Sequence, residues 1–255
     1  MNPYAKKSLI IFDLDGTLAE SKQPMDAEMA ELLDKLLEKK HIAIISGGSF
    51  AQFEKQFLPA VEHTPNAFQN FSNLYLLPAS GSAMYDWKKK KWIKEYSHDL
   101  STAEKQKIRD AFEIALAKVG EKTPEKLYGE QLEDRGSQMT FSALGQAAPI
   151  TVKATWDPTE KRRLAIAAQL QKLLPEFSIG IGGMTSIDVT KSGIDKAFGV
   201  AELSRQTAIP IDQMLYVGDA LFPGGNDYAA RKSGVECFEV AHTGDTKKLI
   251  QKIIG

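Results

Sequence analysis

The chain has 255 residues, of which 43% are hydrophobic and 25% are charged, and its formal net charge at pH 7 is −1. This balance excludes any overall attraction to nucleic acid or to an anionic membrane surface, and we expect no membrane-spanning segment because no apolar stretch is long enough. A single cysteine, Cys237, excludes an internal disulfide and is consistent with a cytoplasmic protein.

The first third of the chain alternates strand and helix patterns. Strands are predicted over residues 9–12, 41–45 and 74–77, and a helix with leucines at helical spacing over 25–40. This β-α-β-α-β order is typical of a mainly parallel sheet with right-handed crossovers. The sequence therefore predicts a Rossmann-like α/β domain.

The middle of the chain has a different pattern, which begins near residue 83. Residues 84–96 read as a β-hairpin, and its run of four lysines favours a solvated hairpin tip over a nucleic-acid site because the whole chain is not basic. Helices are then predicted over 102–118 and 158–174, and strands over 138–142 and 177–181. The parallel pattern returns from residue 187. We therefore predict an α/β core made of residues 1–82 and 188–255, with an inserted α+β cap domain over 83–187.

The most informative stretch is residues 11–18, Ile-Phe-Asp-Leu-Asp-Gly-Thr-Leu. Because side chains alternate along a strand, Asp13 and Asp15 are expected to point the same way from its carboxyl end, the edge at which open α/β sheets bind ligands. Two such carboxylates suit a divalent cation, a nucleophile and a proton shuttle, and the hydroxyl of Thr17 can hold a phosphate oxygen. Alone, the stretch is also compatible with a simple metal-binding turn or a chance loop.

Two further groups suit a phosphate. Ser46 follows the second strand and precedes Gly47 and Gly48, so its hydroxyl and the free backbone N–H groups predict a phosphate cradle, although Ser-Gly-Gly is also a common turn. Lys196 begins a helix, where the helix dipole disfavours a cation, so we expect a compensating partner. It is either a surface lysine or the group that neutralises a phosphoryl group and its nucleophile.

More acidic residues follow the strand over 214–217. Asp219 is predicted as a third metal carboxylate beside Asp13 and Asp15, with Asn226 and Asp227 in support. An all-oxygen ligand set beside phosphate favours Mg²⁺. These parts together predict in-line attack by Asp13 on phosphorus, proton transfer by Asp15, and charge stabilisation by Ser46 and Lys196. Water as the acceptor gives a phosphatase, and a sugar phosphate gives a mutase.

Four stretches, at Asp13–Thr17, at Ser46, at Lys196 and at Asp219–Asp227, follow one another in this order. Together they resemble the signature of the haloacid dehalogenase superfamily. Residues 218–227, Gly-Asp-Ala-Leu-Phe-Pro-Gly-Gly-Asn-Asp, are similar to a stretch of the eukaryotic-type phosphomannomutases, and residues 186–189 resemble that family's Ser-x-Asp-Val. The resemblance implies that Ser186 and Asp188 contact a sugar. Residues 135–145 resemble a cap motif, which makes Arg135 a phosphate-binding arginine; the alternative is an ion pair with Glu133 or Asp134.

The chain departs from the family pattern at three arginine positions, where it has Lys22, Gln146 and Lys153. Loss of one charge and two guanidinium forks weakens a grip on a second phosphate. The resemblance implies a hexose phosphate substrate, bound in part by Gly47 and Lys153, a cap that closes over the core, and a homodimer through the cap. Phosphomannomutase activity is the first interpretation. A sugar-phosphate phosphatase and a non-catalytic phosphosugar-binding regulator are the alternatives.

Overall fold

The computed structural model describes residues 3–255, which form two compact units. The first unit combines the chain up to Ser97 with Asp195–Gly255, and the second is His98–Ile194. The second unit is thus an insertion into the first.

A seven-stranded sheet forms the centre of the first unit. Its strands are β1 (Leu9–Asp13), β2 (His41–Ile45), β3 (Leu74–Leu77), β4 (Ala83–Lys88), β5 (Lys91–Ser97), β10 (Met214–Gly218) and β11 (Glu236–Glu239). The order is β11-β10-β1-β2-β3-β4-β5, and the five strands from β11 to β3 are parallel. Every residue of β1 is buried, as is usual for a parallel strand covered on both faces. The predicted parallel α/β core is confirmed.

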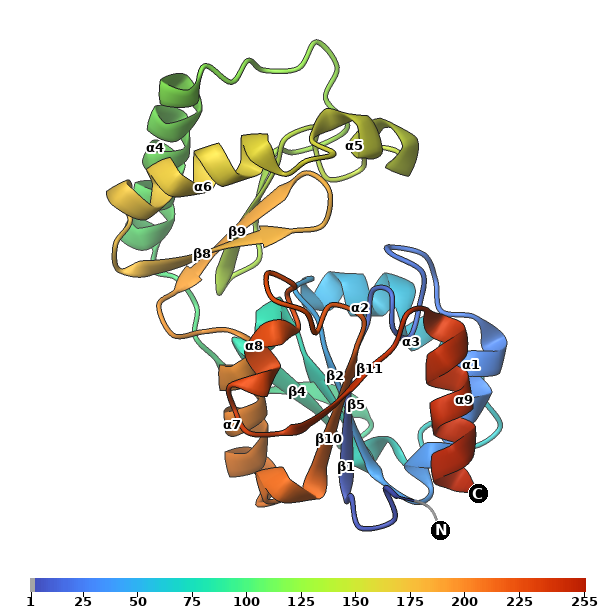
Figure 1. Ribbon diagram of the computed structural model, residues 1–255. Helices are drawn as coiled ribbons and strands as arrows, with labels where there is room; N and C mark the ends of the chain where they lie inside the picture. The colour runs from blue at the N-terminus through green and yellow to red at the C-terminus, as the bar shows by residue number, and fades with distance from the viewer. Residues whose placement is uncertain (1–2) are drawn as a thin grey trace. The chain divides into compact units, whose positions relative to one another are not determined.

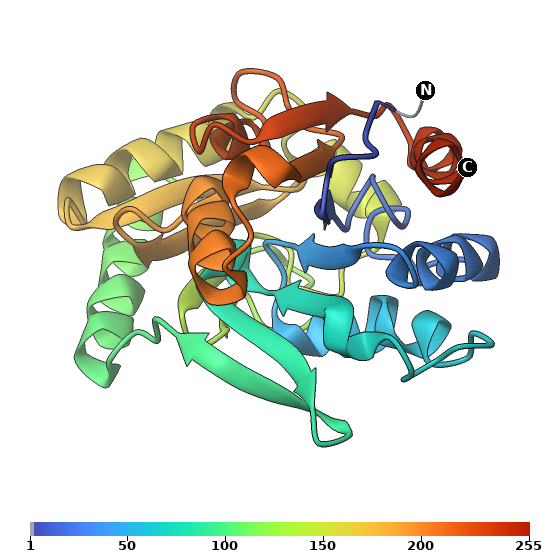
Figure 2. The ribbon, with the colours of Figure 1, turned by 90° about the horizontal axis from the view of Figure 1, so that it is seen from below.

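Helices cover both faces of this sheet. They are α1 (Ala27–Leu37), α2 (Phe50–Gln56), α3 (Leu58–Val61), α7 (Lys196–Thr207), α8 (Tyr228–Arg231) and α9 (Thr243–Ile254), with short 3₁₀ turns at Phe71–Asn73, Ala79–Gly81 and Ile211–Gln213. One apolar cluster joins α1, α2, α3 and α9 to one face, and a second joins α7 and α8 to the other (Figures 1 and 2). No helix formed by residues 3–255 is long and apolar enough to cross a bilayer.

The hairpin of β4 and β5 belongs to the first unit, which corrects the predicted boundary near residue 83. β4 pairs antiparallel with β3, so the hairpin extends the parallel sheet. Its tryptophans explain this attachment, because Trp87 and Trp92 both contact Phe71 and pack against the apolar cluster of the sheet. An antiparallel hairpin marks the end of the parallel pattern, but here it does not mark the end of the unit.

The second unit is a four-stranded antiparallel sheet with two long helices on one face. Its elements are α4 (Thr102–Val119), β6 (Leu132–Asp134), β7 (Gln138–Ser142), α5 (Ile150–Trp156), α6 (Lys161–Leu173), β8 (Phe177–Gly182) and β9 (Ser186–Lys191). The strand order is β6-β7-β9-β8. Helices α4 and α6 bury one face, which includes Phe141, Ile187 and Val189. The predicted return of the parallel pattern at residue 187 is wrong, because β9 is the antiparallel neighbour of β7 and β8.

Candidate active site

Candidate residues of the first unit gather where neighbouring parallel strands end. Asp13 is the last residue of β1, Ser46 follows β2, and Asp219 follows β10. Because β10, β1 and β2 are adjacent and parallel, their carboxyl ends lie at one edge of the sheet (Figure 1). This edge is where ligands bind in open α/β sheets.

Lys196 lies at the centre of the site, between two carboxylates. Its Nζ is 2.5 Å from Oδ1 of Asp13 and 2.5 Å from Oδ1 of Asp227. All three residues are at most 3% exposed. Burial alone would lower the pKa of Lys196, but the two carboxylates outweigh it and raise this pKa, so the side chain is a cation at all physiological pH values. These carboxylates are the compensating partners expected for a lysine at a helix start.

Asp227 is a structural partner as well as a charge. Besides Lys196, it accepts hydrogen bonds from Tyr216 Oη (2.5 Å) and from the backbone N–H of Ala220 (3.0 Å). Burial alone would raise the pKa of Asp227, but Lys196 and these donors lower it. Burial raises the pKa of Tyr216, so this phenol stays a donor. The sequence analysis missed Tyr216, whose signal is a lone hydroxyl in an otherwise apolar strand.

Three carboxylates come close enough to share one ion. Asp13, Asp219 and Asp227 each offer an oxygen, and the three oxygens lie within 4.8 Å of one another. Gly16 makes this approach possible, because a Cβ at that position would lie 2.3 Å from Oδ2 of Asp219. Burial raises the pKa of Asp13, which Lys196 opposes, and burial also raises the pKa of Asp219. The donor set is all oxygen and anionic, and it therefore fits a hard divalent cation.

Asp15 differs from the prediction that grouped it with Asp13 and Asp219 as a metal ligand. The structure places Asp227 in that group, while the side chain of Asp15 is held by other donors. Its Oδ1 accepts from Lys22 N (2.6 Å) and Gln56 Nε2 (2.9 Å), and its Oδ2 accepts from Gln52 Nε2 (3.0 Å). The physical reason is that β1 ends at Asp13, so strand alternation no longer sets the direction of Asp15.

Two of the phosphate candidates, Thr17 and Ser46, are buried. Thr17 is fully buried, and its Oγ1 forms no hydrogen bond within residues 3–255. Ser46 is 2% exposed, and its Oγ accepts from Gly48 N at 3.0 Å. Gly47, which follows Ser46, is half-buried, and Asn226 is exposed. Thr17 thus carries a polar atom that a bound phosphate oxygen would satisfy.

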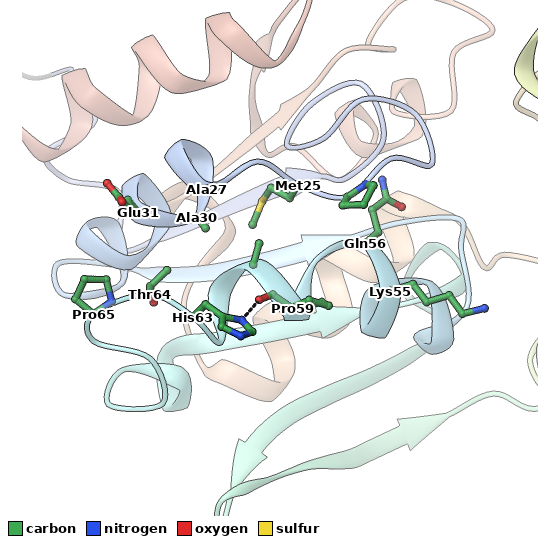
Figure 3. Close-up of a pocket in the computed structure, with 12 residues that line it drawn as sticks. Met25, Ala27, Ala30, Glu31, Lys55, Gln56, Pro59, His63, Thr64 and Pro65 are labelled. Atoms are coloured by element: carbon green, nitrogen blue, oxygen red, sulfur yellow. Dashed lines mark hydrogen bonds between the residues drawn. The ribbon is translucent and has the colours of Figure 1, made fainter.

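A cavity of about 340 Å³ lies between the start of α1 and the α2–α3 segment (Figure 3). Met25, Ala30, Pro59 and His63 are among the residues that line it. It contains none of the clustered carboxylates, but Gln56, which contacts Asp15, is part of its wall. The cavity is therefore a feature of the helical layer and not the site of the carboxylates.

The remaining candidates lie in the second unit. Ser186 Oγ is 3.0 Å from Ser142 Oγ, and Asp188 Oδ1 accepts from Thr140 Oγ1 at 2.7 Å. The register pairs Thr140 with Asp188 and Ser142 with Ser186, so these four residues share the face opposite the helices. The predicted sugar-binding residues are therefore side by side on one polar sheet face.

Two basic candidates of the second unit contact groups of their own unit. Arg135 pairs with Glu133 at 2.7 Å, as the ion-pair alternative expected. Lys153 donates to the backbone oxygen of Gln146 at 3.1 Å, and the buried Nε2 of Gln146 has no partner among the described residues. Both cations are thus placed by neighbours in their own unit.

Comparison with known proteins decides the family. The family model described as "Eukaryotic phosphomannomutase" matches residues 29–255. The chain belongs to the eukaryotic phosphomannomutase family. It is 23% identical to phosphomannomutase 1 of Homo sapiens, over 88% of this chain and 82% of that protein, and 24% identical to the phosphomannomutase of Saccharomyces cerevisiae, over 87% and 84%. The resemblance to the haloacid dehalogenase superfamily and the resemblance to the eukaryotic-type phosphomannomutases are both confirmed.

Solved structures support the same fold. The IMP-nucleotidase of Plasmodium falciparum has a TM-score of 0.72 at 17% identity, over 97% of this chain and 68% of that chain. The trehalose-6-phosphate phosphatase of Aspergillus fumigatus has a TM-score of 0.58 at 17% identity, over 98% and 94%. The chain is an enzyme of the haloacid dehalogenase phosphotransferase or phosphatase type. The family match begins at residue 29, so it does not include Asp13, Asp15 or Thr17.

Proposed function

We propose that this protein interconverts mannose 1-phosphate and mannose 6-phosphate by way of a phosphorylated Asp13. The observation that carries the proposal is the buried Lys196, which contacts both Asp13 and Asp227 at the sheet edge in a chain of the phosphomannomutase family. A buried cation beside a buried carboxylate is suited to an anionic group that arrives and leaves, because its charge is fixed before the reaction.

The chemistry follows from the positions of these side chains. Lys196 contacts Oδ1 of Asp13 and fixes the rotation of the carboxylate, which leaves Oδ2 to attack the phosphorus. Lys196 and Ser46 stabilise the negative charge on the transferring group, and Thr17 supplies a hydroxyl that forms no hydrogen bond with any residue from 3 to 255. Asp15 donates a proton to the departing sugar oxygen and later takes one from the next acceptor. We assign supporting roles beside these catalytic groups to Gly47, Asn226 and Asp227.

Mg²⁺ is the cofactor that we propose for the carboxylate cluster. Asp13 and Asp219 would hold it, with Asp227 behind them, since Asp227 already accepts hydrogen bonds from three donors. When bound, the ion would neutralise charge on the carboxylates and on the phosphoryl oxygens.

For the second unit, we propose that Ser186 and Asp188 bind the sugar hydroxyls and that Arg135 and Lys153 bind the second phosphate. The shared polar face of β7 and β9 supports the first pair. The family resemblance also leads us to propose that the protein is cytoplasmic and forms a homodimer through this unit. Sedimentation of the purified protein tests whether it is a dimer.

A sugar-phosphate phosphatase is the second candidate function. The observation in its favour is that Lys153 and Gln146 stand where the family pattern has arginines, and that Arg135 is paired with Glu133. A mutase must retain a bisphosphate intermediate long enough to turn it round, and a weaker grip on the second phosphate favours its loss to water.

One assay separates the two functions. The purified protein is incubated with Mg²⁺ and mannose 1-phosphate, with and without a hexose 1,6-bisphosphate, while mannose 6-phosphate and free phosphate are measured together. Mannose 6-phosphate that forms only with the bisphosphate supports the mutase. Free phosphate alone supports the phosphatase, and the absence of both products contradicts the assignment of the sugar.

A further inference from the structure

Two glutamines outside every motif hold the carboxylate of Asp15. Gln56 Nε2 donates to Oδ1 at 2.9 Å, and Gln52 Nε2 donates to Oδ2 at 3.0 Å. The two glutamines are one turn apart on α2 and are also bonded to each other, from Gln52 Nε2 to Gln56 Oε1 at 2.7 Å. Asp15 and this glutamine pair (Gln52 and Gln56) therefore form a closed ring of hydrogen bonds.

This ring fixes the orientation of the Asp15 carboxylate. An aspartate that follows a strand end can rotate about both side-chain torsions, and the last of these has no sharp preference. Donors on both carboxylate oxygens, together with the backbone N–H of Lys22 on Oδ1, select one orientation. The donors are neutral amides, so they orient Asp15 without adding a cation that would compete with Lys196 for the carboxylates nearby.

Gln56 also anchors the loop between residues 11–18 and α1. It is 4% exposed, and its backbone oxygen accepts from Met25 N at 2.8 Å. Figure 3 shows that Gln56 and Met25 both line the cavity between α1 and the α2–α3 segment. A buried side-chain amide is tolerated when its hydrogen bonds are made, and here Asp15 and Gln52 make them.

We propose that Gln52 and Gln56 are positioning residues that aim Asp15 at the oxygen of the leaving group. The inference rests on the proposed function, in which Asp15 moves that proton. In the first transfer, a bond forms between Asp13 Oδ2 and phosphorus while the ester P–O bond breaks. The electron pair stays on the sugar oxygen, which receives the proton of Asp15.

The test compares two phosphate esters with the full-length protein and Mg²⁺, and the assay of the sugar phosphate also contains the hexose 1,6-bisphosphate. Mannose 1-phosphate has an alkoxide leaving group that needs a proton, whereas 4-nitrophenyl phosphate releases a stable anion that does not. The variants are Gln52→Met and Gln56→Met, which keep the side-chain length and remove the amide. The control is Gln69→Met, at an exposed glutamine whose side chain forms no hydrogen bond among residues 3–255.

The expected result is a selective loss. In each variant kcat/KM for the sugar phosphate falls by about 10- to 100-fold, a part of the ~10²–10⁴-fold that a general acid contributes, and kcat/KM for the aryl ester falls by less than about threefold. The control variant retains both values. If Gln56→Met does not fold, Gln52→Met, whose side chain is only half-buried, decides the test.

Two other outcomes overturn the inference. Equal losses on both esters show that the glutamines act only through the fold or the phosphate site, and unchanged values show that Asp15 needs no help from them. In both cases the proposed function stands. Absence of turnover of either ester by the unaltered protein overturns the proposed function, and the inference with it.

Discussion

At the scale of single residues, Lys196 shares its positive charge between two buried carboxylates. Its ammonium contacts Asp13 and Asp227, and none of the three side chains is exposed to water to any useful extent. Removing one member of such a group leaves the others as buried and unpaired charges.

Lys196→Met is therefore expected to impair both stability and catalysis. Breaking a buried ion pair costs about 3 to 5 kcal/mol, so the free energy of unfolding in urea, measured with a chelator present, should fall by that amount. The turnover number with Mg²⁺ should fall by at least about 10²-fold, the effect of losing one donor that stabilises transition-state charge. Lys232→Met, at an exposed lysine, is the control. Full activity of the Lys196 variant would contradict its assigned role.

The sequence predicts most of this centre, for a physical reason. Strand ends and helix starts can be predicted from local sequence patterns. These ends determine the positions of four site residues, namely Asp13, Ser46, Lys196 and Asp219. Tyr216 and the glutamine pair cannot be read in that way. They reach the site from the interior of a strand and from the face of a helix, and only the packed structure shows which way those side chains point.

At the scale of elements, one buried ion pair joins α6 of the second unit to Asp157, the residue that follows α5. Arg163 Nε is 3.0 Å from Asp157 Oδ2, both side chains are at most 3% exposed, and Arg163 also donates to the backbone oxygen of Gly183. Burial alone would raise the pKa of Asp157, but the backbone N–H groups of Arg163 and Arg162 and the guanidinium outweigh it and lower this pKa.

This shift predicts an acid-sensitive second unit. Because the pKa of Asp157 is lower in the folded state, its stabilising contribution is complete above the unfolded value of about 3.9 and is lost as the pH falls through the folded value. Hydrogen exchange of the β7 and β9 amides should therefore differ between Asp157→Asn and the unaltered protein by a constant factor above about pH 5, and the difference should shrink below about pH 4.

Glu160→Gln is the matched control for this prediction. Glu160 faces the same guanidinium at 3.6 Å but is 60% exposed, so its loss should change exchange very little at any pH. A difference for Asp157→Asn that grows as the pH falls would have the wrong sign and would contradict the assignment.

The elements themselves are predictable where periodicity is strong. Strands β2, β3 and β7 have the predicted bounds, and α4 differs from its prediction by one residue. β6 and α5, which are short, and β9 were not predicted. β9 has a readable alternation, in which Ser186, Asp188 and Thr190 alternate with Ile187 and Val189. One of its neighbours in the sheet, β8, directly precedes it in the chain, but the other, β7, is distant in sequence.

At the scale of the whole molecule, the two boundaries are the main correction. The predicted cap over residues 83–187 includes the hairpin of the first unit and excludes most of β9, whereas the structure divides the chain after Ser97 and before Asp195. The sequence pattern changes near residue 83 because β4 pairs antiparallel with β3. The hairpin nevertheless stays in the first unit, because Trp87 and Trp92 pack against its apolar cluster.

Two excisions test these boundaries. Replacing residues 98–194 by a short Gly-Ser linker should leave a first unit that unfolds cooperatively in urea. Replacing residues 83–187 should not, because it uncovers the edge of β3 and takes Met84, Trp87 and Trp92 from their clusters. Circular dichroism and the sharpness of the urea transition distinguish the two proteins. A cooperative transition only in the second excision would restore the boundaries predicted from sequence.

In the proposed mechanism Asp13 carries the phosphoryl group during turnover, and this step is tested by trapping that group on the protein. The protein is mixed with Mg²⁺ and a labelled hexose 1,6-bisphosphate, quenched with acid within milliseconds, digested and analysed by mass spectrometry. The account predicts an acyl phosphate on the peptide that contains Asp13, sensitive to hydroxylamine, and none in Asp13→Asn. Rapid turnover by the unaltered protein with the label on another residue, or on none, would contradict it.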